Sequence, residues 1–242
     1  MIMGAMLMTQ CGPKNPMACI MAAMAFADAV VKLICADVSF SQIFVVRSVV
    51  AIPCVVLVLI ATGIRFQLRS MKWALIRSAL LVLTWLVYYA ALPVLSLSVA
   101  AVAIYTNPIF TALLSSVVND ERVSARQWMG VVLGFLGVVA ILRPGTDDFS
   151  WFVLLPLLGA VLYSLAMVLT RSKCQDEQPL VLGLVLHGLF VVTGLVAIAG
   201  LMAFGPDMKL VSEFPFLLDA WSTMVIHEWA LMALLGVLSA AY

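Results

Sequence analysis

The sequence predicts an all-α integral membrane protein, on the basis of its apolar composition, a series of apolar runs of spanning length, and basic residues on alternate connections. Of the 242 residues, 65% are hydrophobic and 10% are charged, and the formal net charge is +1. Soluble domains normally contain about 25% charged residues, so this composition does not fit an aqueous fold. Because the apolar runs are continuous and do not alternate with polar residues, the spanning elements are expected to be helices.

Seven apolar runs are each near the length of about 20 residues that crosses about 30 Å of hydrocarbon as a helix, the fifth being the shortest. We expect these spans at residues 17–35, 44–62, 73–94, 98–118, 127–142, 151–170 and 180–204. An eighth run begins at Trp229. At about 1.5 Å per residue, the run from Trp229 to Tyr242 reaches only about 21 Å. We therefore expect the chain to stop inside its eighth helix, with two further helices missing.

Basic residues indicate how the helices are oriented. Nine lie before the first span or after the second, fourth and sixth spans: Lys14, Arg65, Arg69, Lys72, Arg77, Arg122, Arg126, Arg171 and Lys173. The opposite connections contain only two, Arg143 and Lys209. By the positive-inside rule, the sequence predicts a multi-pass protein of the cell (inner) membrane with a cytoplasmic N-terminus.

A short internal similarity predicts an inverted repeat. Lys72-Trp73-Ala74-Leu75-Ile76 opens the third span, and Glu228-Trp229-Ala230-Leu231-Met232 opens the eighth. If these segments correspond, the repeat unit is five helices, and its odd number places the second copy in the opposite orientation. We therefore expect a first repeat at residues 1–145, with a short N-terminal tail, and an incomplete second repeat at 146–242. Inverted repeats are typical of secondary transporters, whose substrate site lies near the midplane.

Several motifs carry a resemblance to a known family. In chain order they are Tyr105-Thr-Asn-Pro108, Val118-Asn-Asp-Glu121-Arg122, Gln127-Trp-Met-Gly130, then Gly134, Gly137 and Arg143-Pro144-Gly145. The stretch resembles the closing half of an EamA-type repeat of the drug/metabolite transporter superfamily, and Lys32 and Arg47 resemble its opening pattern. This resemblance implies ten helices in two inverted five-helix repeats, cytoplasmic termini, and transport of small metabolites or amino-acid-like compounds. The missing end implies that this chain alone does not complete a transport cycle.

Charged residues inside the spans are candidates for the substrate pathway. Asp28 and Lys32 are four residues apart, so they share a helix face and can pair, and Arg47 lies early in the second span. A charge at the centre of a span costs about 2.5 to 3.5 kcal/mol on insertion scales. One hypothesis is that these residues contact an ionised substrate or exchange a coupling proton. The alternative is an ion pair near the outer interface, with Lys32 extending to the headgroups.

Aromatic residues supply a second candidate group. Trp85, Tyr88 and Tyr89 form one face of the third span, and such a face can line a pocket for an amphipathic solute. The alternative is an aromatic belt at the membrane interface. Two second-repeat residues, Tyr163 and His187, could face the first repeat across the pathway, although a lone intramembrane histidine is often only hydrogen-bonded to a neighbouring helix.

The fourth span contains Pro108, which removes a helical hydrogen bond and predicts a kink. Asn107 and Thr111 share a face beside it, and Tyr105 precedes it, so this region can serve either substrate binding or packing. On the fifth span, Gly130, Gly134 and Gly137 form a stripe of small residues that predicts close helix packing.

Other chemistries lack their motifs. The chain has no GxxxxGK[ST] loop for ATP phosphates, and position 231, where a metalloprotease motif after His227-Glu228 would need histidine, is Leu231. We expect no catalytic residue, metal, cofactor or nucleic-acid partner. The leading function is a secondary carrier of a small solute working by alternating access, and the alternative is a membrane-embedded enzyme or a non-transporting accessory subunit. Its partners would be the solute, the lipid bilayer and a possible second protomer in a homodimer.

Overall fold

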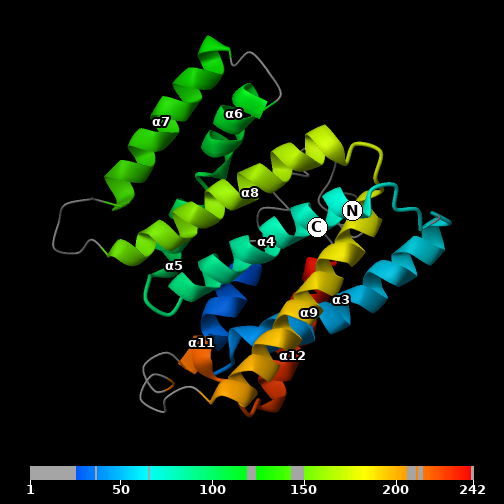
Figure 1. Cartoon of the computed structure of the whole chain (residues 1–242). Helices are drawn as coiled ribbons and strands as arrows, with labels where there is room; N and C mark the ends of the chain where they lie inside the picture. The colour runs from blue at the N-terminus through cyan, green and yellow to red at the C-terminus, as the bar shows by residue number, and fades with distance from the viewer. Residues whose placement is uncertain are drawn as a thin grey trace. The chain divides into compact units, whose positions relative to one another are not determined.

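The structure is a computed structural model that describes residues 26–35, 37–64, 66–118, 124–142, 150–205, 211 and 215–240. Its elements are residues 26–34, then α3 (Phe40–Thr62), α4 (Met71–Ala91), α5 (Leu97–Ile104), α6 (Asn107–Val118), α7 (Ala125–Leu142), η1 (Trp151–Val153), α8 (Leu154–Lys173), α9 (Pro179–Phe204), α11 (Pro215–Leu218) and α12 (Ile226–Ser239) (Figure 1). Within the described ranges all regular secondary structure is helical, which confirms the all-α prediction.

Five helical segments are long and apolar enough to cross a membrane: Phe40–Thr62, Met71–Ala91, Leu97–Val117, Trp151–Lys173 and Pro179–Phe204. They correspond to the second, third, fourth, sixth and seventh expected spans. The fifth and eighth appear as shorter apolar helices, Trp128–Ala140 and Ile226–Ser239. The first expected span lies partly outside the described residues. The chain is thus a multi-pass membrane protein, while the full number of spans stays a prediction.

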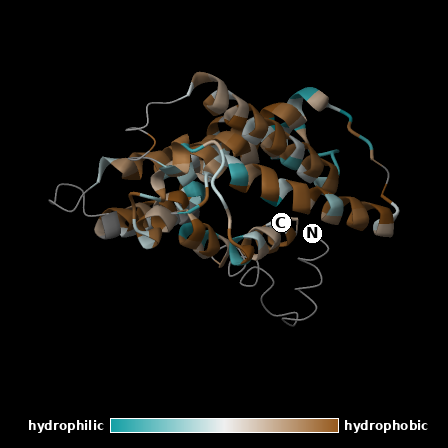
Figure 2. Ribbon diagram, turned by 90° about the horizontal axis from the view of Figure 1, so that it is seen from below, coloured by the Kyte–Doolittle hydropathy of each residue, from teal (hydrophilic) through white to brown (hydrophobic). Residues whose placement is uncertain are grey.

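The surfaces of these helices are apolar, as contact with lipid requires. Most of the helical ribbon is hydrophobic in Figure 2. Large apolar side chains are exposed along the helices, for example Leu57 and Ile60 on α3, Leu133 on α7, and Val196 and Phe204 on α9. In a soluble monomer, such surface would be an aggregation liability or an interaction site. In a membrane it contacts acyl chains at no comparable cost.

The fourth span is interrupted in its middle. We expected one kinked helix, but α5 ends at Ile104 and α6 begins at Asn107, so that Pro108 lies in the first turn of a new helix. Proline is favoured there because the first-turn N–H groups have no helical partner. The Ser164 hydroxyl of α8 donates a 2.8 Å hydrogen bond to the Asn107 carbonyl. A neighbouring helix thus satisfies one carbonyl at the interruption, and the choice between substrate binding and packing stays a prediction.

The chain divides into two compact units. Unit 1 consists of Met1–Arg69 with Glu177–Tyr242, and unit 2 of Ser70–Asp176. In unit 1, α3 packs against α9 and α12; in unit 2, α4 packs against α8, which also contacts α6. Each unit therefore joins segments from both expected repeats. The expected boundary between the repeats, at residues 145 and 146, lies outside the described residues.

Unit 1 is held together by two glycines that allow helices to approach the α3 backbone. A Cβ atom on Gly194 of α9 would lie 2.9 Å from the Ser41 carbonyl oxygen and 2.6 Å from Val45 Cγ2. A Cβ on Gly236 of α12 would lie 2.8 Å from the Arg47 carbonyl oxygen. Such distances are too short for a real Cβ, so only glycine fits. Close backbone approach through small residues is a common means of association between membrane helices.

A polar network fixes the segment before α12 to the start of α3. Gln42 Oε1 accepts hydrogen bonds from the Ser222 N–H (3.1 Å) and hydroxyl (2.7 Å), and from the Ser39 N–H (3.1 Å) and hydroxyl (3.0 Å). Gln42 Nε2 donates to the Ser222 carbonyl at 2.7 Å, and the Ser41 hydroxyl donates to the Ala220 carbonyl at 3.3 Å. This network, here called the Gln42 clamp, also explains why α3 begins at Phe40, before the apolar run itself.

Candidate functional site

In unit 1 a buried arginine contacts an aromatic ring. Arg47 of α3 is 4% exposed, and its guanidinium carbon lies 4.7 Å from the centroid of the Phe190 ring of α9. Phe190 is itself buried and packs at 4.7 Å, edge to face, against Phe44. A guanidinium within about 6 Å of an aromatic face is attracted by the ring quadrupole, and the attraction grows when water is excluded. Arg47 therefore lies inside a span and is enclosed by protein.

His187 joins the same group. It lies one turn before Phe190 on α9, is buried, and its Nδ1 is 3.4 Å from the Ser48 hydroxyl of α3. Its ring centroid is 6.2 Å from that of Phe190. Arg47 and His187 therefore both contact Phe190, although they are distant in the sequence. We call Phe44, Arg47, Ser48, His187 and Phe190 the Arg47 cluster; it combines a fixed positive charge, an imidazole and aromatic rings.

In unit 2 the aromatic residues of α4 form one cluster, as predicted. The Trp85 ring centroid is 5.8 Å from that of Tyr88 and 5.4 Å from that of Tyr89, and the two tyrosine rings are 5.9 Å apart. Both tyrosines are 1% exposed. Both tyrosines are therefore enclosed by protein side chains, and the choice between a solute pocket and an interfacial belt is still open. The role of the cluster in a substrate pathway stays a prediction.

A second arginine lies between α4 and α8. Arg77 Nε donates a 2.8 Å hydrogen bond to the Thr170 hydroxyl, and Arg77 interacts electrostatically with the half-buried Tyr163. Because residues 77 and 170 meet at one end of the pair, while Thr84 meets Gly159 further along, the two helices are antiparallel. Tyr163, one of the predicted pathway residues, therefore lies near the Arg77 cation of the neighbouring helix α4.

The remaining predicted residues lie on the helix of residues 26–34 and around the interruption of the fourth span. Asp28 is buried and Lys32 is half-buried, both on the helix formed by residues 26–34. Tyr105 is 42% exposed at the interruption between α5 and α6, whereas Asn107 and Thr111 are half-buried in the first turns of α6. Their role in a substrate pathway stays a prediction.

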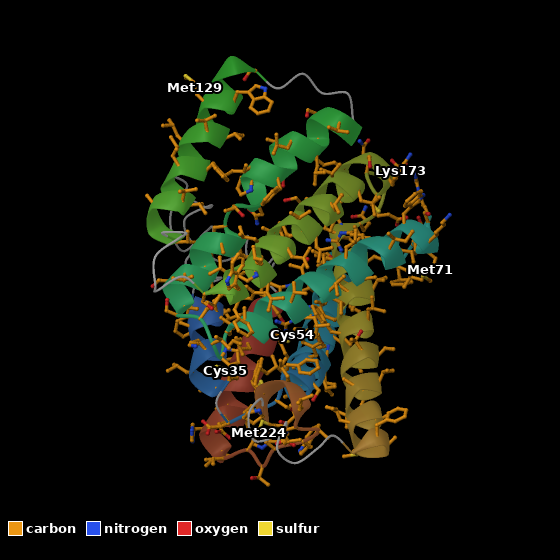
Figure 3. All side chains as sticks on the ribbon, turned by 60° about the vertical axis from the view of Figure 1, so that its left-hand side comes forward. Cys35, Cys54, Met71, Met129, Lys173 and Met224 are labelled. Carbon is orange, nitrogen blue, oxygen red and sulfur yellow. The ribbon has the colours of Figure 1, made fainter. Side chains whose placement is uncertain are left out.

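The glycine stripe of α7 faces a loosely packed region. A Cβ on Gly134 would lie 3.2 Å from Ile109 Cδ1 of α6, but a Cβ on Gly130 or Gly137 would meet no described atom within 4 Å. An open cavity of about 460 Å³ lies between α6 and α7 and is lined almost entirely by apolar side chains. Figure 3 shows α7, marked by Met129, at the edge of its unit. The predicted packing role of the stripe stays a prediction.

Several residues of these clusters were not recognised in the sequence: Gln42, Ser48, Arg77 as a side-chain partner, Ser164, Thr170 and Phe190. Serine, threonine and phenylalanine are ordinary residues in a membrane helix, so none of them stands out there. Arg77 was assigned only to the positive-inside count. Among the described residues, no group of three His, Cys, Asp or Glu side chains could hold a metal ion.

Comparison with known proteins identifies the family. Residues 16–143, more than half of the chain, match the EamA-like transporter family. The chain is 33% identical over 102 residues to a riboflavin transporter of Rhizobium johnstonii, covering 42% of this chain and 33% of that protein. It is 25% identical over 210 residues to a riboflavin transporter of Vibrio cholerae, covering 84% of this chain and 68% of that protein.

A third relative is an S-adenosylmethionine uptake transporter of Rickettsia prowazekii, 25% identical over 145 residues, which are 60% of this chain and 43% of that protein. The alignments with these three proteins thus cover between one third and about two thirds of their lengths. The family match contains the ordered motifs from Tyr105 to Arg143 on which the resemblance was based. The chain belongs to the EamA-like transporter family of membrane proteins.

Proposed function

We propose that this chain forms the solute-binding part of a secondary transporter that carries a small metabolite across the membrane by alternating access. The observation that carries the proposal is the Arg47 cluster, in a chain that belongs to a transporter family. A buried charge within a span is costly, so such a residue commonly serves a solute or ion pathway. Arg47, with His187 beside it, offers a positive charge and hydrogen-bond donors to a solute.

Riboflavin and S-adenosylmethionine are the first solutes to test, because relatives bearing those names align with this chain. Both the Arg47 cluster and the aromatic cluster of α4 contain rings on which a flat solute could stack. Since Arg47 and His187 are each 4% exposed, a solute reaches them only if helices of unit 1 move. Such a movement is what an alternating-access cycle requires.

The inverted repeat belongs to the same proposal. The second and seventh expected spans, which would be counterparts, are α3 and α9. Ser48 lies near His187 and Ser41 near Gly194, so these helices pack antiparallel, which is the relation between inverted copies. We propose the cytoplasmic N-terminus on the base count. Cysteines introduced singly at positions 69 and 148 of a cysteine-free variant should react with membrane-impermeant reagents from opposite sides. Labelling from the same side would refute this orientation.

The test of transport has two steps. Purified protein is screened for metabolites, including riboflavin and S-adenosylmethionine, that raise its melting temperature. Uptake of each stabilising metabolite is then measured in vesicles containing the full-length protein that its gene encodes. We expect saturable uptake that Arg47→Ala abolishes and that Arg171→Gln, an exposed arginine of α8, leaves intact. The proposal is wrong if no stabilising metabolite accumulates, or if uptake persists in Arg47→Ala.

A further inference from the structure

At one end of unit 2, a tryptophan lies between two lysines. The Lys72 Nζ atom is 5.5 Å from the centroid of the Trp73 ring, and the Lys173 Nζ atom, from the end of α8, is 5.8 Å from it. Both lysines are exposed and Trp73 is half-buried. Figure 3 shows this end of the unit, marked by Met71 and Lys173. Tryptophan is enriched at the level of lipid headgroups, where its ring contacts the hydrocarbon edge and its N–H group the polar layer.

A third cation extends the group. Arg77 lies one turn after Trp73 on α4, and its Nε is held by the Thr170 hydroxyl at 2.8 Å. The Arg77 Nη1 atom is buried without a hydrogen-bond partner among the described residues. Among the residues that the structure describes, no carboxylate forms an ion pair with Lys72, Arg77 or Lys173. The group therefore brings together three basic side chains without a directly paired carboxylate in the described ranges.

The helix dipole adds to this imbalance. Lys72 lies in the first turn of α4, which contains no acidic residue. The N-terminus of a helix is its positive end, where anions are favoured and cations are not. The lysine of α8 has the favourable location, in the last turn of its helix. An anion beside Lys72 would thus relieve an unfavourable arrangement on α4 while gaining the attraction of all three cations.

Apolar surface adjoins the charges. Met71, Leu75 and Ile76, in the first turns of α4, are 56%, 41% and 38% exposed. Leu75 and Ile76 follow Met71 and Lys72 by one turn, so they lie beside the basic group. A free inorganic anion would gain nothing from this surface. An amphiphile with an anionic headgroup would contact the cations with its phosphate and the apolar residues with its acyl chains.

We propose that Lys72, Trp73, Arg77 and Lys173 bind the phosphate group of an anionic phospholipid at the end where α4 begins and α8 ends. The exposed Lys72 and Lys173 ammonium groups donate to the phosphate oxygens, the Arg77 guanidinium adds its positive charge beneath them, and Trp73 fixes the depth of the headgroup. Basic pockets between membrane helices are known to bind anionic headgroups. This site does not depend on the proposed transport activity.

The test measures lipid binding by native mass spectrometry of the purified chain in detergent. Phosphatidylglycerol should bind with higher affinity than phosphatidylcholine of the same acyl length. Each basic residue near the headgroup contributes on the order of fivefold in affinity, so Lys72→Gln/Lys173→Gln should weaken phosphatidylglycerol binding about 25-fold. Arg171→Gln is the matched control, because this exposed arginine of the same turn of α8 is not one of the cations over the Trp73 ring, and it should stay within about twofold of wild type.

Three outcomes would overturn the proposal. They are equal affinity for the two lipids, equal loss in Arg171→Gln and in the double variant, and complete displacement of phosphatidylglycerol by millimolar inorganic phosphate. The last would assign the site to a free anion. Circular dichroism confirms that each variant is folded. Trp73→Phe serves as a second variant, because it keeps a ring but removes the N–H group; it should weaken binding less than the double lysine substitution.

Discussion

The main helix pairs of the two units, α3 with α9 and α4 with α8, are both antiparallel but pack by different means. In unit 1, a Cβ on Gly194 would lie 2.9 Å from a backbone oxygen of α3. In unit 2, a Cβ on Gly159 would lie 3.4 Å from the Thr84 carbonyl oxygen and 3.1 Å from the movable Ile104 Cδ1. Unit 1 is thus fixed by backbone contact, whereas unit 2 leaves room for side chains to adjust.

The polar groups differ in the same way. Arg47 is enclosed against Phe190 between closely packed helices, whereas Arg77 is half-buried and bonded to the single hydroxyl of Thr170. Both arginines lie about two turns after the start of their helices, so the difference is in their surroundings and not in their depth. Arg47 is held by packing against an aromatic ring, whereas Arg77 is held by one hydrogen bond. The following substitutions test this difference.

The largest effect is expected from Arg47→Met, which keeps the volume but removes the charge. Hydrogen bonds from a charged donor contribute about 1.5 to 3 kcal/mol, so solute affinity should fall about 10- to 100-fold. Isothermal titration with a metabolite found in the stability screen measures this. Arg77→Met, the equivalent change in unit 2, should leave the affinity within about threefold. Equal losses of solute affinity in the two variants would contradict the assignment of solute binding to Arg47 alone.

The next effect concerns the glycines. Gly194→Ala and Gly236→Ala should each lower the free energy of unfolding by about 1 to 3 kcal/mol, because the added methyl group meets α3 backbone atoms. Gly159→Ala should cost less, since the Ile104 side chain can rotate away. Gly200→Ala on α9 is the control: nothing described lies within 4 Å of its Cβ, so it should be neutral or stabilising by up to about 1 kcal/mol. Unfolding in mixed micelles by denaturant measures all four.

The smallest expected effect is the loss of unfolding free energy when a hydroxyl group that contacts a neighbouring helix is removed. Thr170→Val removes the acceptor of the 2.8 Å bond from Arg77 in unit 2 and should cost about 1 kcal/mol of unfolding free energy. Ser48→Ala removes the longer, 3.4 Å contact with His187 in unit 1 and should cost less than about 0.5 kcal/mol. The same unfolding assay resolves the two. A larger cost for Ser48→Ala would show that unit 1 depends on its polar contacts and not on its glycines.

The helices were predictable because continuous apolar runs of spanning length have few other solutions in a membrane. The expected spans at 73–94 and 180–204 match α4 and α9 within a few residues. The interruption at residues 105 and 106 was predicted only as a kink, because Pro108 signals a local change but does not say whether the helix restarts. The hydrogen bond that the Asn107 carbonyl accepts there comes from Ser164 of α8, which lies far along the chain and could not be paired with it from the sequence.

The candidate site was predictable in part. Arg47 and His187 stand out because polar groups are rare inside spans, and the spacing of Trp85, Tyr88 and Tyr89 is enough to predict their cluster on one helix. The contact of Arg47 with Phe190 could not be predicted, because it depends on the register between α3 and α9. Gly194 sets that register, yet it is one of many glycines in the chain and lies outside the regular stripe at Gly130, Gly134 and Gly137.

The Gln42 clamp has a consequence for the biogenesis of the protein. Gln42 and Ser222 are separated by 180 residues, which a ribosome takes roughly 9 to 36 s to add at about 5 to 20 residues per second. During that interval Gln42 Oε1 has only the local Ser39 donors and Gln42 Nε2 lacks the Ser222 carbonyl, so we expect the start of α3 to stay in the hydrated headgroup layer or against the translocation machinery. Once Ser222 has been synthesised, the Gln42 amide can donate to its carbonyl and become buried. Burial of the start of α3 is therefore a late step of folding, which waits for the synthesis of the segment before α12.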